Sequence, residues 1–290
     1  MRPGLIRLLP IVFLLLLGGC MSRGIPQTVG SGEQPEARAV LQKSAEAHGL
    51  AAFRQIEDVS VSYAGEWYGL VSKVQPTLID ADFRQSSQER IILQGRLLIA
   101  QRHLGPKGSK QVIRPAGDVQ VFYNDVPADN RDVLAAAALV ADGYRMFLTG
   151  PFYFLDSNLS LEMGEDENVE GRPCTTLIAV RRPGHGDSIE DRYLLFIDRE
   201  NYLLRRIRFT MEGLESTRGA IAEVDFFNHR EIAGVTWPTR FYERLRKPIP
   251  GLPVHDWRLI GLDVNRGLNE TDISEANFSA KAATPARPIE

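Results

Sequence analysis

The chain has 290 residues, with 34 Lys and Arg against 37 Asp and Glu, so its formal net charge is −3. Charged residues at 24% and hydrophobic residues at 43% exclude an intrinsically disordered chain. The slight acidic excess argues against a general nucleic-acid binder, which needs positive charge to neutralise phosphates. Two cysteines cannot form a disulfide scaffold. The composition is that of a globular protein, except at the N-terminus.

Residues 1–19 have the pattern of an export signal. Arg2 and Arg7 supply positive charge, and the apolar run Leu8–Leu17 is about half as long as a membrane-spanning helix. The run ends in Leu17-Gly18-Gly19-Cys20, which resembles the lipobox of bacterial lipoproteins. That motif implies cleavage before Cys20 and acylation of the new N-terminal cysteine. The alternative is an ordinary secretory signal that happens to end beside a cysteine.

Acylation would anchor the protein to a membrane, since two or more acyl chains, such as palmitate, bind stably where one does not. Met21 occupies the position at which an aspartate would resemble an inner-membrane retention signal. The expected location is therefore the outer membrane, facing the periplasm. Residues 20–35 are rich in Gly, Pro, Ser and Gln and are expected to form a flexible tether. Cys174 then has no internal disulfide partner.

The rest of the chain predicts a single domain over 36–280 and a disordered tail over 281–290. A helix is expected from Glu36 to His48, followed by a capping glycine at 49. Apolar and polar residues then alternate with a period of two, as in half-buried strands, over 59–67, 91–99, 119–123, 203–211, 222–226, 235–241 and 260–264. Residues 177–180 are apolar on both faces. Residues 192–198 and 203–211 are expected to form a hairpin around the turn 199–201, with Arg206 and Arg208 on the face opposite to Ile207 and Phe209. Strands joined by short polar turns predict a mostly antiparallel sheet, and the absence of a βαβ rhythm argues against a parallel one.

One predicted helix interrupts the strands, from about Arg131 to Leu148. Asp129 to Asp132 can cap it, and Gly150-Pro151 ends it. Because the helix is apolar on most of its circumference, we expect it to be buried against the sheet. Two interpretations stay open for this helix and the aromatic segment that follows it: plain core packing, or a plug over a cavity lined by the sheet.

Motifs for catalysis and metal binding are absent from the sequence. We find no nucleophile elbow, phosphate-binding loop or dinucleotide fingerprint, and the five histidines never have metal-ligand spacing. No catalytic residue, metal site or cofactor is therefore predicted. His185 lies among Pro, Gly and charged residues and is expected in an exposed loop.

The C-terminal half resembles the bacterial outer-membrane lipoprotein-sorting superfamily. The segment 196–206 (FIDRENYLLRR) is similar to its strand-turn-strand motif, and 223–226 with 231–239 is similar to its recurrent "D…G-V-x-x-P" segment. Asp263-Val264-Asn265 and Phe278 resemble its closing strand, and the N-terminal helix fits its opening helix. The resemblance covers about 36–280. Unlike the carrier members, this chain has its own lipobox.

The resemblance implies a fold of mostly β structure with helical cover (α+β): a curved, incomplete antiparallel β-barrel with helices over its concave face. It also implies that acyl chains, or another hydrophobic ligand, bind between sheet and helices. The predicted function is a noncatalytic, membrane-anchored binder or carrier of lipid or lipoprotein acyl chains in the bacterial envelope, with a possible envelope protein partner. Two alternatives stay open: an interaction module with a filled core, and a hydrolase whose site forms only in three dimensions.

The candidate ligand-binding residues are those expected to face the hollow. From the strands these are Val61, Tyr63, Trp67, Leu93, Leu97, Val121, Ile207, Phe209, Val224, Phe226 and Trp237, and from the helical cover Leu134, Ala138, Phe147 and Phe152.

Overall fold

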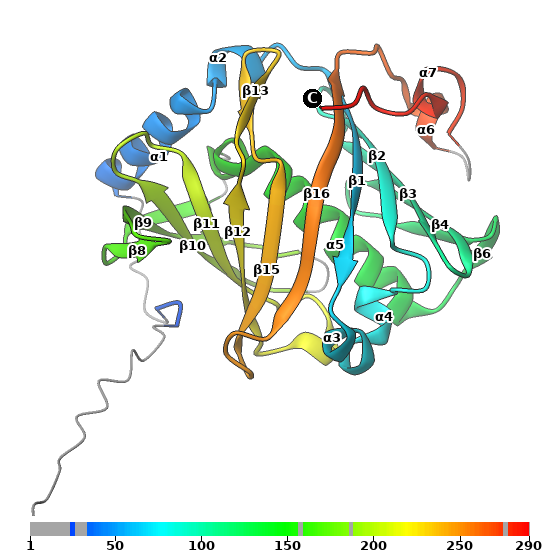
Figure 1. Ribbon diagram of the computed structural model, residues 1–290, viewed down its shortest axis with the longest axis horizontal. Coiled ribbons are helices and arrows are strands. Elements are labelled where there is room, and N and C mark those ends of the chain that lie inside the picture. Colours follow the sequence, from blue (N-terminus) through cyan, green and yellow to red (C-terminus); the bar gives the residue numbers. More distant parts are fainter. Residues whose placement is uncertain (1–23, 27–33, 156–158, 186–187, 275–277, 290) are drawn as a thin grey trace, which may run out of the picture.

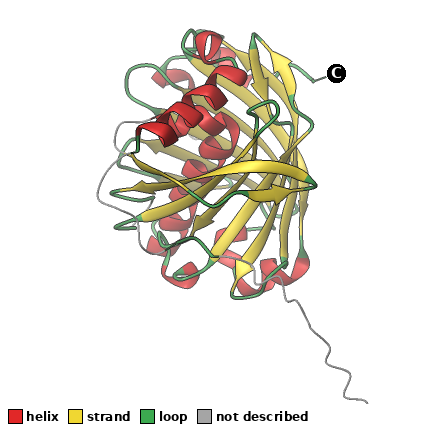
Figure 2. Cartoon of the chain, turned by 90° about the vertical axis from the view of Figure 1, so that its left-hand side faces the viewer, coloured by secondary structure: helices red, strands yellow, loops and turns green. Residues whose placement is uncertain are grey.

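Fourteen strands pair into one curved antiparallel sheet that does not close on itself (Figure 2). The order is β6-β5-β4-β3-β2-β1-β16-β15-β12-β11-β10-β9-β7, and β8 pairs with β9. The computed structural model describes residues 24–26, 34–155, 159–185, 188–274 and 278–289. The strands are β1 Asp58–Trp67, β2 Ser86–Ile92, β3 Leu98–Gly105, β4 Gly108–Pro115, β5 Gln120–Tyr123, β6 Val126–Ala128, β7 Leu159–Met163, β8 Glu167–Val169, β9 Arg172–Arg181, β10 Asp191–Asp198, β11 Leu204–Thr210, β12 Ile221–Phe227, β15 Arg240–Lys247 and β16 Pro253–Val264.

The two longest helices, α1 and α5, lie on the concave side of this sheet (Figures 1 and 2). A separate two-stranded ribbon pairs β13 (Arg230–Ile232) with β14 (Val235–Trp237). The predicted fold class, an incomplete antiparallel barrel with helical cover, is confirmed. The helices are α1 Pro35–Ala47, α2 Leu50–Phe53, α3 Gly69–Val74, α4 Pro76–Ile79, α5 Arg131–Thr149, α6 Glu270–Ile273 and α7 Ala280–Ala283, with 3-10 turns η1 Gly150–Leu155 and η2 Glu215–Thr217.

Helix α5 joins the two edges of the sheet, because the chain leaves the sheet at β6 and re-enters it at β7. The Asn130 side chain caps α5 by accepting hydrogen bonds from the backbone N–H groups of Asp132 and Val133 at 2.9 and 3.1 Å. The segment Arg131–Leu155 is long and apolar enough to cross a membrane, but 56% of its most apolar window is buried in the protein. It is therefore the central helix of the core.

Aromatic side chains connect α5 to the strands beneath it. The ring of Tyr144 lies 6.0 Å from that of Tyr63 on β1, and Phe147 lies 5.6 Å from Phe209 on β11. These residues belong to one large buried cluster that runs along the concave face. Alternation along each strand places this apolar set inward, as the period of two predicts.

The opposite face of β11, β12 and β15 carries buried charges. Glu223 is 0% exposed and lies 3.0 Å from Arg208 Nε and 2.7 Å from Arg244 Nη2. Asp225 accepts two hydrogen bonds from Arg206 and a third, at 2.7 Å, from Arg244. Strand β11 is the second strand of the hairpin expected over 192–211. The expected alternation, with its arginines on one face and its apolar residues on the other, is thus observed.

Part of the predicted tether is fixed to the outside of the sheet. Ile25 is 3% exposed and belongs to a small apolar cluster with Cys174, Leu194 and Phe196. Arg192 Nη1 donates to the Pro26 carbonyl at 2.9 Å. The expectation of a fully flexible tether over 20–35 is wrong at this point, because a single isoleucine finds an apolar site between side chains of β9 and β10.

The expectation of a disordered tail over 281–290 also differs from the structure, which describes residues up to 289. Ala282 is 0% exposed, and its carbonyl accepts a hydrogen bond at 2.9 Å from Arg90 of β2. Arg266 donates to the carbonyls of Thr284 and Pro285 at 2.6 and 2.7 Å. Hydrogen bonds from two arginines therefore hold this segment against the domain.

Candidate ligand-binding cavity

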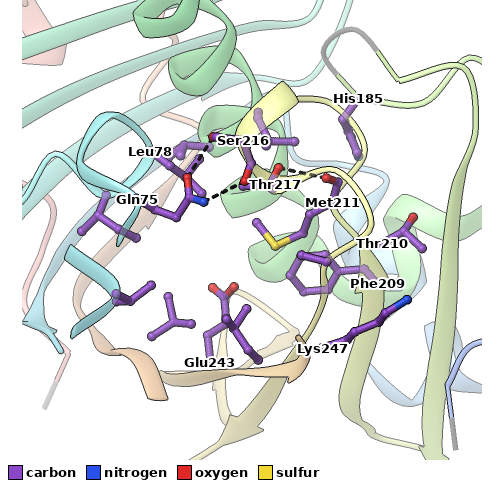
Figure 3. Close-up of a pocket in the computed structure, with 18 of the residues that line it drawn as sticks. Gln75, Leu78, His185, Phe209, Thr210, Met211, Ser216, Thr217, Glu243 and Lys247 are labelled. Atoms are coloured by element: carbon purple, nitrogen blue, oxygen red, sulfur yellow. Dashed lines mark hydrogen bonds between the residues drawn. The ribbon is translucent and has the colours of Figure 1, made fainter. Parts of the chain in front are cut away.

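A cavity of about 670 Å³ lies between α5, the α3–α4 segment and the adjoining ends of the sheet strands (Figure 3). It is partly open to solvent. Its wall is predominantly apolar, which is typical of small-molecule sites. The apolar and aromatic lining residues are Trp67, Val71, Val74, Leu78, Ile79, Leu139, Val140, Tyr144, Met146, Phe147, Tyr193, Phe209, Met211, Leu245, Pro248, Ile249, Leu252 and Val254.

The lining follows from the two local periods. On α5, Leu139, Gly143 and Phe147 are four residues apart and so share one face of the helix. At the end of β11, Phe209 lies in the strand and Met211 follows it directly. Both line the cavity, because every second residue of a strand lies on the same face. Strand β15 likewise presents Glu243, Leu245 and Lys247.

Three of the fifteen candidate lining residues, Trp67, Phe147 and Phe209, border this cavity. The other twelve lie elsewhere in the concave core, which their side chains fill. Val61, Tyr63, Val121, Ile207, Val224, Phe226 and Trp237 are buried in the large cluster, Leu93, Leu97, Leu134 and Phe152 pack against it, and Ala138 is 5% exposed on α5. Cys20, the expected lipidation site, lies outside the described residues.

Sequence reasoning missed the α3–α4 segment, which supplies one wall. Val71, Leu78 and Ile79 are buried in its two short helices. No single helical period joins them, because Gln75, with φ −131° and ψ 58°, interrupts the helix between α3 and α4. The turn between β15 and β16 was also missed, because nothing in its sequence shows that it lies beside α5.

His185 was expected in an exposed loop, and this expectation is wrong. Its side chain borders the cavity and is only 7% exposed. Tyr153 Oη lies 2.8 Å from His185 Nε2, and Asp142 Oδ2 lies 3.5 Å from Nδ1. Asp191 accepts a hydrogen bond at 2.6 Å from the backbone N–H of His185, which folds the loop inward.

The carboxyl of Asp142 links this histidine to the sheet, because Arg114 Nη2 lies 3.0 Å from the same oxygen. Burial opposes ionisation of Asp142, but the hydrogen bonds and charges of His185 and Arg114 outweigh it, and the pKa of this carboxyl is lowered. The arrangement ties α5 to η1 and to the loop before β10. In the part of the chain that the structure describes, no three His, Cys, Asp or Glu side chains are placed to hold a metal ion.

Two polar side chains join across the rim of the cavity. Gln75 Nε2 donates to the Ser216 carbonyl at 2.8 Å, and Ser216 Oγ donates to Gln75 Oε1 at 2.8 Å (Figure 3). Gln75 stands between α3 and α4, whereas Ser216 belongs to η2. The Gln75–Ser216 pair therefore connects two segments that are far apart in sequence and that both line the cavity.

A buried carboxyl group lies on the same concave face. Glu89 of β2 pairs with Val61 of β1, is 1% exposed, and accepts hydrogen bonds from Ser87 Oγ at 3.2 Å and Gln101 Nε2 at 2.9 Å. Burial raises the pKa of Glu89 to about 7, although both hydrogen bonds act in the opposite direction.

The raised pKa predicts a pH-dependent stability. Between pH 4.5, the usual pKa of glutamate, and pH 7, the unfolded chain releases this proton while the folded chain retains it. Stability is therefore lost as pH rises through this window, by about 3 kcal/mol for a shift of this size. Glu89→Gln should unfold at higher denaturant than the parent at pH 8 and show no such gain at pH 4, in urea titrations at both pH values. Glu66→Gln, at an exposed position on β1, should show no difference. An equal gain at both pH values would contradict the assignment.

Neither a protein-family model nor a curated protein matches the chain. Among solved structures, a LolA superfamily protein from Nitrosomonas europaea matches with 14% identity and a TM-score of 0.46, covering 82% of this chain and 96% of that one. A putative outer-membrane lipoprotein-sorting protein domain from Vibrio parahaemolyticus matches with 11% identity and a TM-score of 0.42 over the same shares. A DUF1329 family protein from Desulfovibrio piger matches with 12% identity and a TM-score of 0.48, again covering 82% and 96%. The fold described above rests on the strand pairing itself.

Proposed function

We propose that the chain is a noncatalytic, membrane-anchored binder or carrier of lipid or lipoprotein acyl chains in the bacterial envelope. The observation that carries this proposal is the apolar cavity of about 670 Å³ beside α5. Such a volume lies within the range of roughly 300–1,000 Å³ of ligand sites. Each methylene group that moves there from water contributes about 0.8 kcal/mol, so an acyl chain binds without any reaction.

Native mass spectrometry tests this proposal. The mature chain carrying Cys20→Ser would be purified without detergent, so that it has no acyl anchor of its own. We expect copurified lipid, or saturable binding of a fluorescent fatty acid after the bound lipid is stripped. If neither is found, the chain is not a lipid binder.

The anchor is part of the same proposal: acylation of Cys20, with the protein on the outer membrane facing the periplasm. Labelled palmitate should enter the parent chain and not the Cys20→Ser variant. The parent should fractionate with the outer membrane, and the variant with the soluble periplasm. A variant that stays in the membrane fraction would show that something other than Cys20 holds it there.

The two alternatives receive less support. An interaction module would have a filled core, whereas this core contains an open cavity. A hydrolase would need a nucleophile such as a Ser, Thr or Cys side chain beside a base. The hydroxyl beside His185 Nε2 is instead the buried phenol of Tyr153, which accepts a hydrogen bond from Arg181 Nη1 at 2.9 Å. A partner that delivers or accepts the lipid remains part of the proposed role.

Removing the Gln75–Ser216 pair should speed ligand exchange. In Gln75→Ala both hydrogen bonds are lost, and two solvent-exposed bonds of this kind contribute about 1 kcal/mol in total. We therefore expect a fluorescent fatty acid to dissociate about fivefold faster in stopped-flow measurements. Gln42→Ala is the matched control, because Gln42 donates to Glu46 at 3.0 Å on the exposed face of α1 and does not line the cavity. Equal dissociation rates in parent and Gln75→Ala would show that the pair does not control exchange.

A further inference from the structure

Arg84 is a buried cation in the wall of the cavity. Its side chain is 2% exposed and lines the space beside Trp67 and Tyr144. The guanidinium carbon lies 4.6 Å from the centroid of the Trp67 ring and 5.5 Å from that of Tyr144. Two aromatic faces thus hold the guanidinium and offset part of the charge, but they leave its hydrogen-bonding edge without an acceptor.

Only one of the three guanidinium nitrogens is engaged. Nη1 donates to the carbonyls of Leu78 and Ile79 in α4, each at 3.2 Å. Nε has no hydrogen-bond partner, and among the described residues none accepts from Nη2. The Tyr144 hydroxyl, in the same cavity wall, has no hydrogen-bond partner within 3.5 Å, although it lies near enough to Arg84 to interact with the guanidinium. An unpartnered buried donor is strongly unfavourable unless water or a ligand satisfies it.

The other buried arginines show what is missing at Arg84. Arg206 and Arg208 each face a carboxylate, and Arg90 donates from all three nitrogens. On Arg240, which is only partly buried, the Nε and Nη2 edge holds Asp256 in a two-point contact of 2.9 and 2.7 Å. The same edge of Arg84 is the unpaired one.

No carboxylate among the described residues forms a hydrogen bond with the Nε and Nη2 edge of Arg84. No ion pair within 4 Å joins Arg84 to an acidic residue in the described ranges, although the buried carboxyl of Glu89 acts on it from farther away. Glu243, which lines the same cavity, has its Oε2 at 2.7 Å from His255 Nε2. Buried arginine is rare unless it is paired, so the counter-ion of Arg84 is expected from outside the chain.

We infer that Arg84 binds an anionic group, a carboxylate or a phosphate, at the polar end of the acyl ligand, with the Tyr144 hydroxyl as a second donor. The planar edge formed by Nε and Nη2 matches both anions in a two-point contact. This inference rests on the proposed function, since it concerns the same cavity. It narrows the ligand class to acidic amphiphiles, either a free fatty acid or a lipid with a phosphate headgroup.

Three ligands with one chain length test the inference: dodecanoate, dodecanol and dodecyl phosphate, each in competition with a fluorescent fatty acid at neutral pH. In the parent, at least one anion should bind at least tenfold more tightly than the alcohol. The better of the two anions identifies the source as a free acid or a phosphate. Equal affinity for all three in the parent overturns the inference while leaving the proposed function intact, whereas binding of none of them overturns the proposed function itself.

Arg84→Gln should remove the preference for the anion, to within about threefold, without weakening the binding of dodecanol. Lys73→Gln is the matched control, because Lys73 is an exposed cation of α3 that does not line the cavity, and its preference should equal that of the parent. A preference that survives Arg84→Gln also overturns the inference. Arg84→Lys, which keeps the charge without the planar edge, should retain part of the preference. If the glutamine variant does not fold, the parent ligand series and the lysine variant still decide the question.

Discussion

Replacing Gly143 with tryptophan is expected to abolish ligand binding while leaving the fold intact. Gly143 lies in the interior of α5 and lines the cavity, and a Cβ built there meets no atom within 4 Å. A side chain at this position therefore begins in open space and extends from α5 into the cavity. We expect at least a tenfold loss of affinity for a fluorescent fatty acid, measured by titration, with the thermal unfolding midpoint preserved.

Gly143→Ala is the matched control for this substitution. A single methyl group leaves most of the cavity empty, so binding should be nearly unchanged. Alanine in place of glycine in a helix interior stabilises by roughly 0.5–1 kcal/mol, so this variant should also be more resistant to urea than the parent. If the tryptophan variant folds and binds with parental affinity, the cavity is not the binding site.

The substitution Glu223→Gln is expected to cause the largest loss of stability. Glu223 is fully buried, and Arg208 and Arg244 lie within 3.0 Å of its carboxylate. Two further arginines, 206 and 246, lie within 3.7 Å. Removing one partner from a buried charge cluster leaves its cations uncompensated, at a cost of about 3–5 kcal/mol. For a domain of this size the melting temperature should fall by about 10 °C.

The control for Glu223→Gln is Glu215→Gln. Glu215 lies 3.1 Å from Arg218, but both side chains are mostly exposed, at 82% and 60%. Hydration already satisfies such a pair, so its loss should change the free energy of unfolding by less than about 0.5 kcal/mol. Circular dichroism during heating and in urea measures both variants. Equal stability of the two variants would mean that the buried charges do not contribute to stability.

The sequence predicted the elements and their faces well because local rules determine them. The helix expected over 131–148 is α5, Arg131–Thr149, and the hairpin around 199–201 joins β10 to β11. The alternation of Ile207 and Phe209 with Arg206 and Arg208 identified the inward face. These features depend on side-chain period and turn chemistry, which neighbouring residues set among themselves.

The position of the cavity could not be predicted from side-chain period or turn chemistry. Alternation shows which face of the sheet a side chain occupies, but it does not show where along the strands the core is filled and where it is empty. Val224 and Phe226 were placed on the correct face, yet they lie where the core is filled. The cavity exists because α3, α4 and the turn between β15 and β16 meet beside α5, and contacts between such distant segments leave no local pattern. For the same reason His185 and the residues after 280 were misassigned: Asp191 and Arg90, which fix them, act through side chains.

The buried position of Ile25 limits the distance between the domain and the membrane anchor proposed at Cys20. With Cys20 acylated as proposed, five peptide units join the anchor to Ile25, and a fully extended segment of that length spans roughly 17 Å. If Ile25 were not buried against β9 and β10, the extended chain from 20 to 35 would span roughly 50 Å. The outer surface of β9 and β10 then stays close to the lipid headgroups of the membrane that holds the anchor. Under the proposed function, the ligand must therefore be delivered to the protein at that membrane.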